Sequence, residues 1–203
     1  MRLDRAFFAR RTTVVARALV GQTLVRVEDN GARTAGRIVE TEAYLGPEDR
    51  AAHTHGYRHT PRNHAIWMHP GAAYVFFTYG MHHCFNVSTL AEGKPQAVLV
   101  RALEPVEGLD RMRQRRSKAR RDTDLCSGPA KLCQALGINL THDRLDLTRS
   151  PHLWIARTRR RAHPASRIAA GPRVGVDYAG DWAARPLRYC LHGSPHVSPP
   201  RPG

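Results

Sequence analysis

Two glutamates and a tyrosine at alternate positions of one apolar run are the residues whose types and spacing best suit chemistry. The run RIVETEAY contains Glu40, Glu42 and Tyr44. Side chains alternate between the two faces of a strand, so Ile38, Glu40, Glu42 and Tyr44 are predicted to share one face. On a solvated face, the more common case, such glutamates have no special role. Beside a cleft, poor hydration raises the pKa of a carboxyl group towards the working pH and lets it act as a general base.

The flanking pattern predicts the elements that would position these side chains. TLVRV alternates as a strand, DNG supplies a hairpin turn and residues 32–44 return as its partner. The remaining strands are predicted at residues 72–80, 84–89, 97–105, 152–156, 173–178 and 187–193. Helices are predicted from Thr12 to Gly21, from Glu104 to Arg121 and over residues 128–137.

Strands and helices follow one another irregularly, which predicts an α+β fold with a mostly antiparallel sheet and flanking helices. A length of 203 residues suits a single domain over residues 1–203, and we expect residues 195–203 to fray. The polar stretch from Leu45 to Gly71 is predicted to be an ordered loop with a helical turn near Glu48 to His53. Loops of this length in compact domains are usually functional or disordered.

The charge balance indicates a polyanionic partner. The chain carries 32 Lys and Arg against 17 Asp and Glu, a net charge of +15, and such a field attracts nucleic acid above all. Only three of the basic residues are lysines, which limits the candidates for covalent chemistry through an amine. No apolar stretch approaches the roughly 20 residues of a membrane span, and the amino terminus lacks a signal-peptide segment, so we expect an intracellular protein.

Cysteine and histidine usage argues against a disulfide scaffold and against a metal site. The four cysteines are too few and too unevenly spaced for a disulfide framework. Five histidines lie between His53 and His69, but no pair has the spacing of a zinc-binding helix and no CxxC accompanies them. We therefore expect no metal and no other cofactor. A histidine-rich metallohydrolase remains an alternative that rests on this cluster alone.

Several longer segments of the chain resemble the motifs of one known protein family. The segments GRIVETEAYLGPEDRAAH, TPRN, YVFFTYGMHHCFNV, VLVRALEPVEGL, LCSGPAKLCQALGI, RVGVDYAG and LRYCLHGSPHVS together resemble the alkyladenine (3-methyladenine) DNA glycosylase family. They follow the family's order and cover nearly the whole chain. The resemblance implies a monofunctional enzyme that removes alkylated or deaminated purines from duplex DNA, with water as the nucleophile. A non-catalytic protein that binds damaged DNA is the rival hypothesis.

The resemblance assigns catalytic roles to two residues. Glu42, the second glutamate of ETEAY, would be the general base that activates the water and stabilises an oxocarbenium-like transition state. Arg101, the arginine of RALEP, would help to hold that water and the sugar phosphate. Only the resemblance favours this role over the alternative, in which Arg101 is an arginine at a strand end paired with Glu104 or Glu107. Glu40 is left with a structural role.

A flipped base needs a slot, and the resemblance assigns its walls to Tyr44, His53 and Phe76. Phe76 departs from the tyrosine that relatives often carry there, so the stacking face is kept but a hydroxyl is lost. Asn86 corresponds to the pocket asparagine that disfavours normal guanine. Its alternative role is that of a buried strand residue that satisfies backbone groups.

The remaining assignments concern the DNA itself. Tyr79 matches the family's intercalating wedge at a hairpin tip, with Met81 beside it, although a tyrosine before glycine more often packs at a strand end. Arg58, Arg62 and Lys131 fall at positions that resemble the family's phosphate contacts. We expect a monomer that binds double-stranded DNA containing damaged purines and no membrane. A bacterial protein of this kind would lie in the cytoplasm with the nucleoid.

Overall fold

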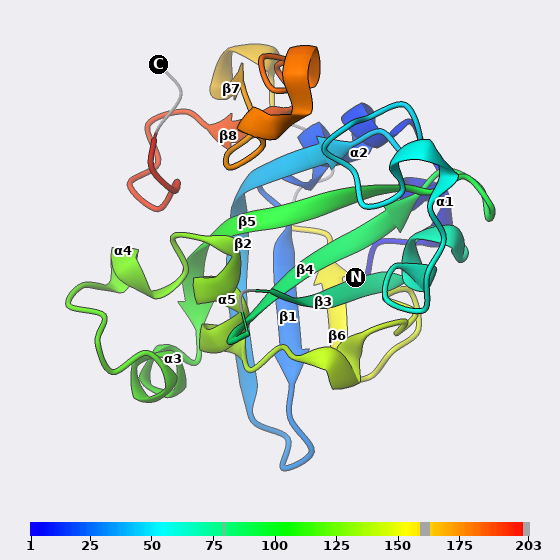
Figure 1. Cartoon of the computed structure of the whole chain (residues 1–203). Coiled ribbons are helices and arrows are strands. Elements are labelled where there is room, and N and C mark those ends of the chain that lie inside the picture. The colour runs from blue at the N-terminus through cyan, green and yellow to red at the C-terminus, as the bar shows by residue number, and fades with distance from the viewer. Residues whose placement is uncertain (79, 159–162, 201–203) are drawn as a thin grey trace.

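The two longest strands, β2 (Arg33–Tyr44) and β5 (Gln96–Glu107), lie side by side in the middle of the sheet in the computed structural model (Figure 1). The structure describes residues 1–78, 80–158 and 163–200. Within these residues eight strands form one sheet with the path β3-β4-β5-β2-β1-β6, to which β8 and β7 are added beside β2. The shorter strands are β1 (Thr23–Val27), β3 (Ala73–Thr78), β4 (His82–Thr89), β6 (Leu153–Ala156), β7 (Ile168–Gly171) and β8 (Arg188–Leu191). All of these pairings are antiparallel, which confirms the predicted fold class.

One edge of β2 is divided between two partners. Residues 33–37 pair with β1, whereas residues 40–42 pair with β8, and β5 runs along the other edge. The two glutamates of the opening motif are therefore enclosed by strands on both sides. Their backbone groups lie in the interior of the sheet and not on an exposed edge.

The strict alternation predicted for β2 is wrong at one point. The pairing of β2 with β5 shifts register between Ile38 and Glu40 and again between Glu40 and Thr41. A bulge of this kind changes the face to which the following side chains point. Ile38 accordingly packs in the main hydrophobic core with Ala43, whereas Tyr44 lines a cavity and bonds to Glu42.

Two amphipathic helices contribute most of the helical part of the core. The helix α2 (Thr12–Leu19) contacts β2 and β5, and α5 (Pro129–Leu136) contacts β4 and β5 (Figure 1). Leu19, Leu132 and Leu136 are fully buried. The helix α5 ends as predicted at Gly137, whose positive φ of 70° suits glycine. The remaining helices are short: α1 (Arg5–Phe8), α3 (Leu109–Arg115) and α4 (Asp122–Leu125).

The helix predicted from Glu104 to Arg121 is wrong in its extent. The strand β5 continues to Glu107, and α3 covers only Leu109–Arg115. Gly108 separates the two with a φ of 76°, and a Cβ on this residue would lie 2.3 Å from the carbonyl oxygen of Arg33. The backbone must turn sharply at Gly108. The apolar residues before it that recur at helical spacing therefore belong to the strand, and the helix begins only after the turn.

Three smaller predictions are also corrected. Residues 173–178 are not a strand but lead into a 3-10 helix (Asp177–Trp182), and the strand that pairs with β8 is β7. Thr12 is the first helical residue and not the cap, because its hydroxyl bonds to Thr89 at 2.8 Å. The helical turn expected near Glu48 to His53 falls slightly later, at the 3-10 helix His55–Tyr57.

The chain after β8 is ordered where the sequence predicts fraying. Val197 and Ser198 are each 3% exposed. Val197 packs with Val39, Ala102 and Cys190, and the backbone N–H of Ser198 donates to Glu40 at 2.7 Å. The prediction is therefore wrong for this segment, because a buried carboxylate holds it; residues 201–203 lie outside the described part.

The four cysteines are free, as the sequence predicts, and the structure shows that all four are buried. Among the residues that the structure describes, no helix is long and apolar enough to cross a lipid bilayer.

Candidate active site

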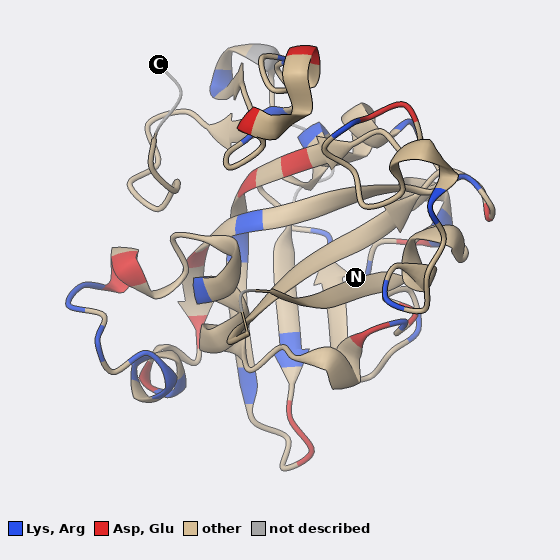
Figure 2. Ribbon diagram, viewed as in Figure 1, with Lys and Arg blue, Asp and Glu red and all other residues tan. Residues whose placement is uncertain are grey.

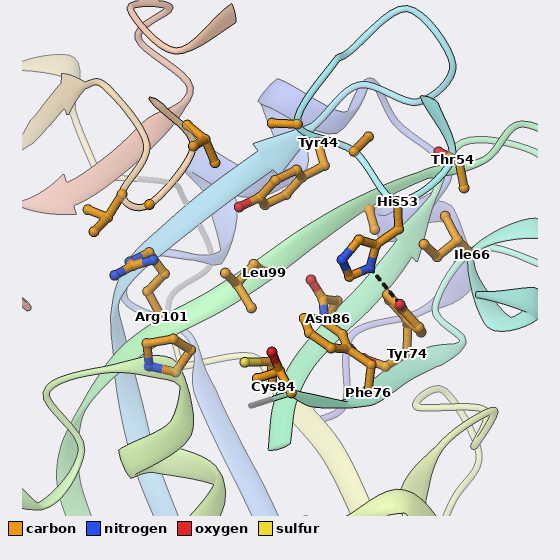
Figure 3. Close-up of a pocket in the computed structure, with 18 of the residues that line it drawn as sticks. Tyr44, His53, Thr54, Ile66, Tyr74, Phe76, Cys84, Asn86, Leu99 and Arg101 are labelled. Atoms are coloured by element: carbon orange, nitrogen blue, oxygen red, sulfur yellow. Dashed lines mark hydrogen bonds between the residues drawn. The ribbon is translucent and has the colours of Figure 1, made fainter. Parts of the chain in front are cut away.

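A cavity of about 220 Å³ lies against one face of the sheet, between β2–β5 and the loop that follows β2 (Figure 3). Strand register explains why residues far apart in sequence meet there. Tyr74 pairs with Asn86, Asn86 with Leu99, and Leu99 with Glu42, so these four positions form one row across four strands. Side chains in such a row emerge on the same face of a sheet. The lining includes six residues discussed below: Tyr44, His53, Tyr74, Phe76, Asn86 and Arg101.

Glu42 is fully buried next to this cavity, which excludes the solvated face considered for it. Its carboxylate accepts hydrogen bonds from the backbone N–H of Val174 at 2.8 Å and from the hydroxyl of Tyr44 at 2.9 Å. Arg101 lies 3.3 Å away as an ion-pair partner. Burial raises the pKa of Glu42, and the charge of Arg101 opposes part of that rise.

Arg101 pairs with the two glutamates of the opening motif and not with its neighbours in sequence. Its Nε donates to Glu40 at 3.0 Å, and its Nη1 faces Glu42. Glu104 pairs with Arg37, and Glu107 pairs with Arg33. The sequence-based alternative of a strand-end ion pair is therefore wrong, because β2 supplies both partners across the sheet.

Three of the expected slot residues lie together in the cavity wall (Figure 3). Tyr44 comes from β2, Phe76 from β3 and His53 from the loop. The rings of His53 and Phe76 are 4.7 Å apart between centroids in an edge-on arrangement, and Nδ1 of His53 lies 2.7 Å from the hydroxyl of Tyr74. Tyr74 was not predicted as a site residue, although it stands two positions before Phe76 on the same strand face.

His53 is held in its neutral form. Loss of hydration in the cavity wall, together with the positive charges of Arg62 and Arg58, lowers the pKa of His53 to about 4. Part of this residue remains exposed at the mouth of the cavity. Water there screens the two guanidinium groups, so the effect matters for the charge of the site and little for folding stability.

Asn86 both lines the cavity and bonds to the backbone. The side chain is 4% exposed, and its amide nitrogen donates to the backbone carbonyl of Tyr74 at 3.2 Å. The same side chain lines the cavity between Cys84 and Leu99 (Figure 3). A strand asparagine with a backbone partner is fixed in orientation, which suits it to shape the floor of a pocket.

A buried ion pair behind the cavity was missed in the sequence. Arg173 and Asp49 are both completely buried and form two hydrogen bonds of 2.6 and 2.8 Å. The guanidinium of Arg173 also lies 4.7 Å from the centre of the Tyr44 ring. It therefore supports Tyr44 and fixes the neighbouring Val174, whose N–H reaches Glu42. Residues 173–178 belong to one of the motifs that resemble the family. Because they were predicted to form a strand, neither the ion pair of Arg173 nor the bond from Val174 to Glu42 was expected.

The hairpin between β3 and β4 reaches the mouth of the cavity. Thr78, the last residue of β3, lines the cavity, and Met81 in the following turn is 70% exposed. Tyr79, the expected wedge, lies outside the described residues. Phe77 on the same hairpin is also exposed.

The expected phosphate-binding residues lie around the cavity. Arg58 and Arg62 line an adjoining cavity of about 320 Å³ that shares His53 and Tyr74 with the first. Lys131 in α5 donates to the hydroxyl of Ser127 at 3.3 Å, two residues from Pro129 in the lining of the first cavity. The three basic residues thus come from two separate parts of the chain.

Two of the five loop histidines, His59 and His64, stack on each other, and His59 also stacks on Trp67. The ring centroid of His59 is 5.2 Å from that of His64 and 4.6 Å from that of Trp67. Within the described residues no group of three or more His, Cys, Asp or Glu side chains is arranged to hold a metal ion.

The model of the methylpurine-DNA glycosylase (MPG) family matches residues 6–195. The chain belongs to this family. A human DNA-3-methyladenine glycosylase is 50% identical over 97% of this chain and 68% of its own length, and a mouse DNA-3-methyladenine glycosylase is 46% identical over 97% of this chain and 61% of its own length. A putative 3-methyladenine DNA glycosylase of Myxococcus xanthus is 48% identical, and the match covers 99% of this chain and 96% of that protein. The family and the enzyme class predicted from the motifs are therefore confirmed: the chain is a DNA glycosylase.

Proposed function

We propose that this glycosylase hydrolyses the bond between base and sugar at alkylated purines in duplex DNA, with 3-methyladenine and 7-methylguanine as substrates, and thereby starts base excision repair. The observation that carries the proposal is Glu42, a completely buried carboxylate paired with Arg101 at the wall of a cavity. Hypoxanthine and ethenoadenine are further candidate substrates.

Glu42 would act as the general base. Its carboxylate accepts two hydrogen bonds and faces one guanidinium, and an ionised carboxylate has about four acceptor sites, so one acceptor site is left for a water. The water oxygen bonds to the sugar carbon as the bond to the base breaks. The base leaves with the bonding electron pair, and the proton of the water passes to Glu42. The negative charge of Glu42 also stabilises the positive charge that develops on the sugar.

Arg101 would keep Glu42 ionised and hold the water and the sugar phosphate. It lines the cavity and lies 3.3 Å from Glu42, so its charge favours the ionised form of the base. No amine is needed for this mechanism. Water is the nucleophile, and no covalent bond to the protein forms.

The cavity would receive a base rotated out of the DNA stack, because the sugar carbon of a stacked base is inaccessible inside the duplex. Tyr44, His53 and Phe76 offer ring faces and edges, and a cationic base gains about 0.5 to 2 kcal/mol from an aromatic face. That attraction selects alkylated purines over normal ones. Asn86 in the floor would crowd the exocyclic amino group of guanine.

The hairpin and the basic residues would hold the rest of the DNA. Tyr79 and the exposed Met81 would fill the gap left by the rotated nucleotide. Arg58, Arg62 and Lys131 would bind phosphates, and such contacts set affinity and its salt dependence more than the choice of base. We infer that the protein acts as a monomer, because one domain spans one lesion.

The purified protein is expected to release free 3-methyladenine from methylated duplex DNA, at the same rate with and without EDTA. The measurement is chromatography of the released base. Loss of release with the chelator would favour a metallohydrolase. Binding of methylated DNA without release of any methylated purine, or of hypoxanthine from a hypoxanthine duplex, would favour the non-catalytic binding protein.

The rate of release is expected to fall in acid through an apparent pKa above 4.5, the ordinary value for this carboxyl group. Burial raises the pKa of Glu42, and only the ionised form is a base, so activity is lost at a higher pH than for an exposed glutamate. His53, with a pKa of about 4, begins to take up a proton only at the acidic end of this range. Single-turnover rates on 7-methylguanine DNA test this, because that base is already cationic and needs no proton. A profile that stays flat down to about pH 4 would contradict it.

A further inference from the structure

We propose that Glu40 is a positioning residue which, fixed by the segment that follows β8, aims Arg101 at Glu42. This inference rests on the proposed function and extends it to residues outside the cavity. It assigns a role in the reaction to residues 197–200, which the sequence predicted to be a frayed tail.

Glu40 is a completely buried carboxylate with four hydrogen-bond donors around it. Oε1 accepts from Nε of Arg101 at 3.0 Å, from Nε of Arg188 at 2.6 Å and from the hydroxyl of Ser198 at 2.9 Å. Oε2 accepts from the backbone N–H of Ser198 at 2.7 Å. Three donors on one oxygen and one on the other hold the carboxylate of Glu40 in a single orientation.

The same contacts fix the plane of Arg101. Its Nε is bound by Glu40, and its Nη2 donates to the hydroxyl of Ser198 at 3.4 Å. The remaining Nη1 is the atom that faces Glu42 at 3.3 Å. A guanidinium is planar and rigid, so two held nitrogens determine where the third one points. The contacts of Arg101 with Glu40 and Ser198 therefore determine how Arg101 is placed against Glu42.

The segment after β8 is itself clamped in place. Arg188 in β8 donates to the carbonyl oxygen of Ser198 at 2.8 Å and to that of Pro200 at 2.7 Å. Val197 packs with Val39 and Cys190. Arg188 therefore holds Glu40 and the backbone of the segment at the same time, which gives Ser198 a defined position next to Arg101.

The charges of this cluster connect Glu40 to the titration of Glu42. Two carboxylates share two guanidinium groups, because Arg101 contacts both glutamates and Arg188 contacts Glu40. The other groups that face Glu42 are the hydroxyl of Tyr44, the N–H of Val174, the guanidinium of Arg173 and the thiols of Cys84 and Cys190. If Glu40 loses its negative charge, Arg101 pairs with Glu42 as its only carboxylate partner. The pKa of Glu42 is then expected to fall.

The test compares Glu40→Gln with Glu104→Gln, a matched variant on β5 whose glutamate pairs with Arg37 and touches neither Arg101 nor Glu42. Single-turnover rates of 7-methylguanine release are measured against pH, together with DNA binding and thermal unfolding. For Glu40→Gln we expect the plateau rate to fall by about 10- to 100-fold and the acidic limb to move to lower pH, with DNA affinity unchanged. The control is expected to keep both the parent rate and the parent limb.

A purely structural role would lower the folded fraction equally at every pH and leave the acidic limb in place, so that result would overturn the proposal. If Glu40→Gln does not fold, Ser198→Ala carries the test, because it removes two hydroxyl contacts and keeps the backbone N–H bond to Glu40. It is expected to reduce the plateau rate by about 2- to 10-fold. An unchanged rate in a folded Ser198→Ala would also overturn the proposal. A parent protein that releases no alkylated base would instead overturn the proposed function itself.

Discussion

Replacement of Glu42 by Gln is expected to reduce the rate of base release by about 10²- to 10⁴-fold while DNA binding is retained. The amide keeps the size of the side chain and one acceptor for the N–H of Val174 or the hydroxyl of Tyr44. It cannot take the proton of the attacking water, and it removes the negative charge beside the sugar. The protein fold should survive, because the change relieves the burial of a charge at a site that is completely inaccessible to solvent.

The measurement is single-turnover release from methylated duplex DNA at saturating protein, with affinity determined separately. Glu107→Gln is a suitable control, because Glu107 also lies in the central pair of strands but pairs with Arg33 at a half-exposed position. Release by Glu42→Gln at the parent rate would exclude this residue as the base. Equal loss of release and of DNA binding would instead indicate a role in binding.

Asp49→Asn is expected to destabilise the protein by about 3 to 5 kcal/mol, because it leaves the guanidinium of Arg173 buried without its counter-charge. Asp49 also accepts the N–H groups of Leu45 and Ala51 at 2.9 and 3.0 Å, so the loop after β2 depends on the same carboxylate. Although burial lowers the pKa of Arg173, the hydrogen bond and the charge of Asp49 outweigh it and keep the guanidinium charged.

The free energy of unfolding in urea or by heat measures this effect, with an expected loss of melting temperature on the order of 10 °C. Asp29→Asn is the matched control, because the side chain of Asp29 is 98% exposed and its replacement should change stability by less than about 0.5 kcal/mol. Similar melting temperatures for both variants would show that the buried pair contributes little. Because Arg173 lies over Tyr44, Asp49→Asn should also slow base release in the fraction that remains folded.

The net charge of +15 overstates how many basic residues are available to DNA. Figure 2 shows Lys and Arg distributed over helices, strands and loops, with acidic residues close to many of them. In the region of α3 and α4, Arg113 pairs with Asp110 and Asp122, and Arg121 pairs with Asp124. The composition therefore predicts nucleic acid as the class of partner correctly, but it does not show which arginines contact the DNA.

The sequence by itself determined much of the fold and the positions of the site residues in the chain. The hairpin of β1 and β2 follows from alternation around Asn30 and Gly31, and α5 follows from Pro129 at its start and Gly137 at its end. These are local signals, since turn and cap conformations depend on a few neighbouring residues. The family motifs likewise named Tyr44, His53, Phe76, Asn86 and Arg101, all of which line one cavity.

Only the tertiary structure decided which partners these residues meet. Without the family resemblance, Arg101 was expected to pair with Glu104 or Glu107 on its own strand, yet it bonds to Glu40 on β2. Asp49 and Arg173 meet across 124 residues, and Ser198 reaches Glu40 across 158 residues. Such contacts depend on strand order, register and a bulge at Glu40, which arise from packing of the whole sheet and leave no local pattern in the sequence.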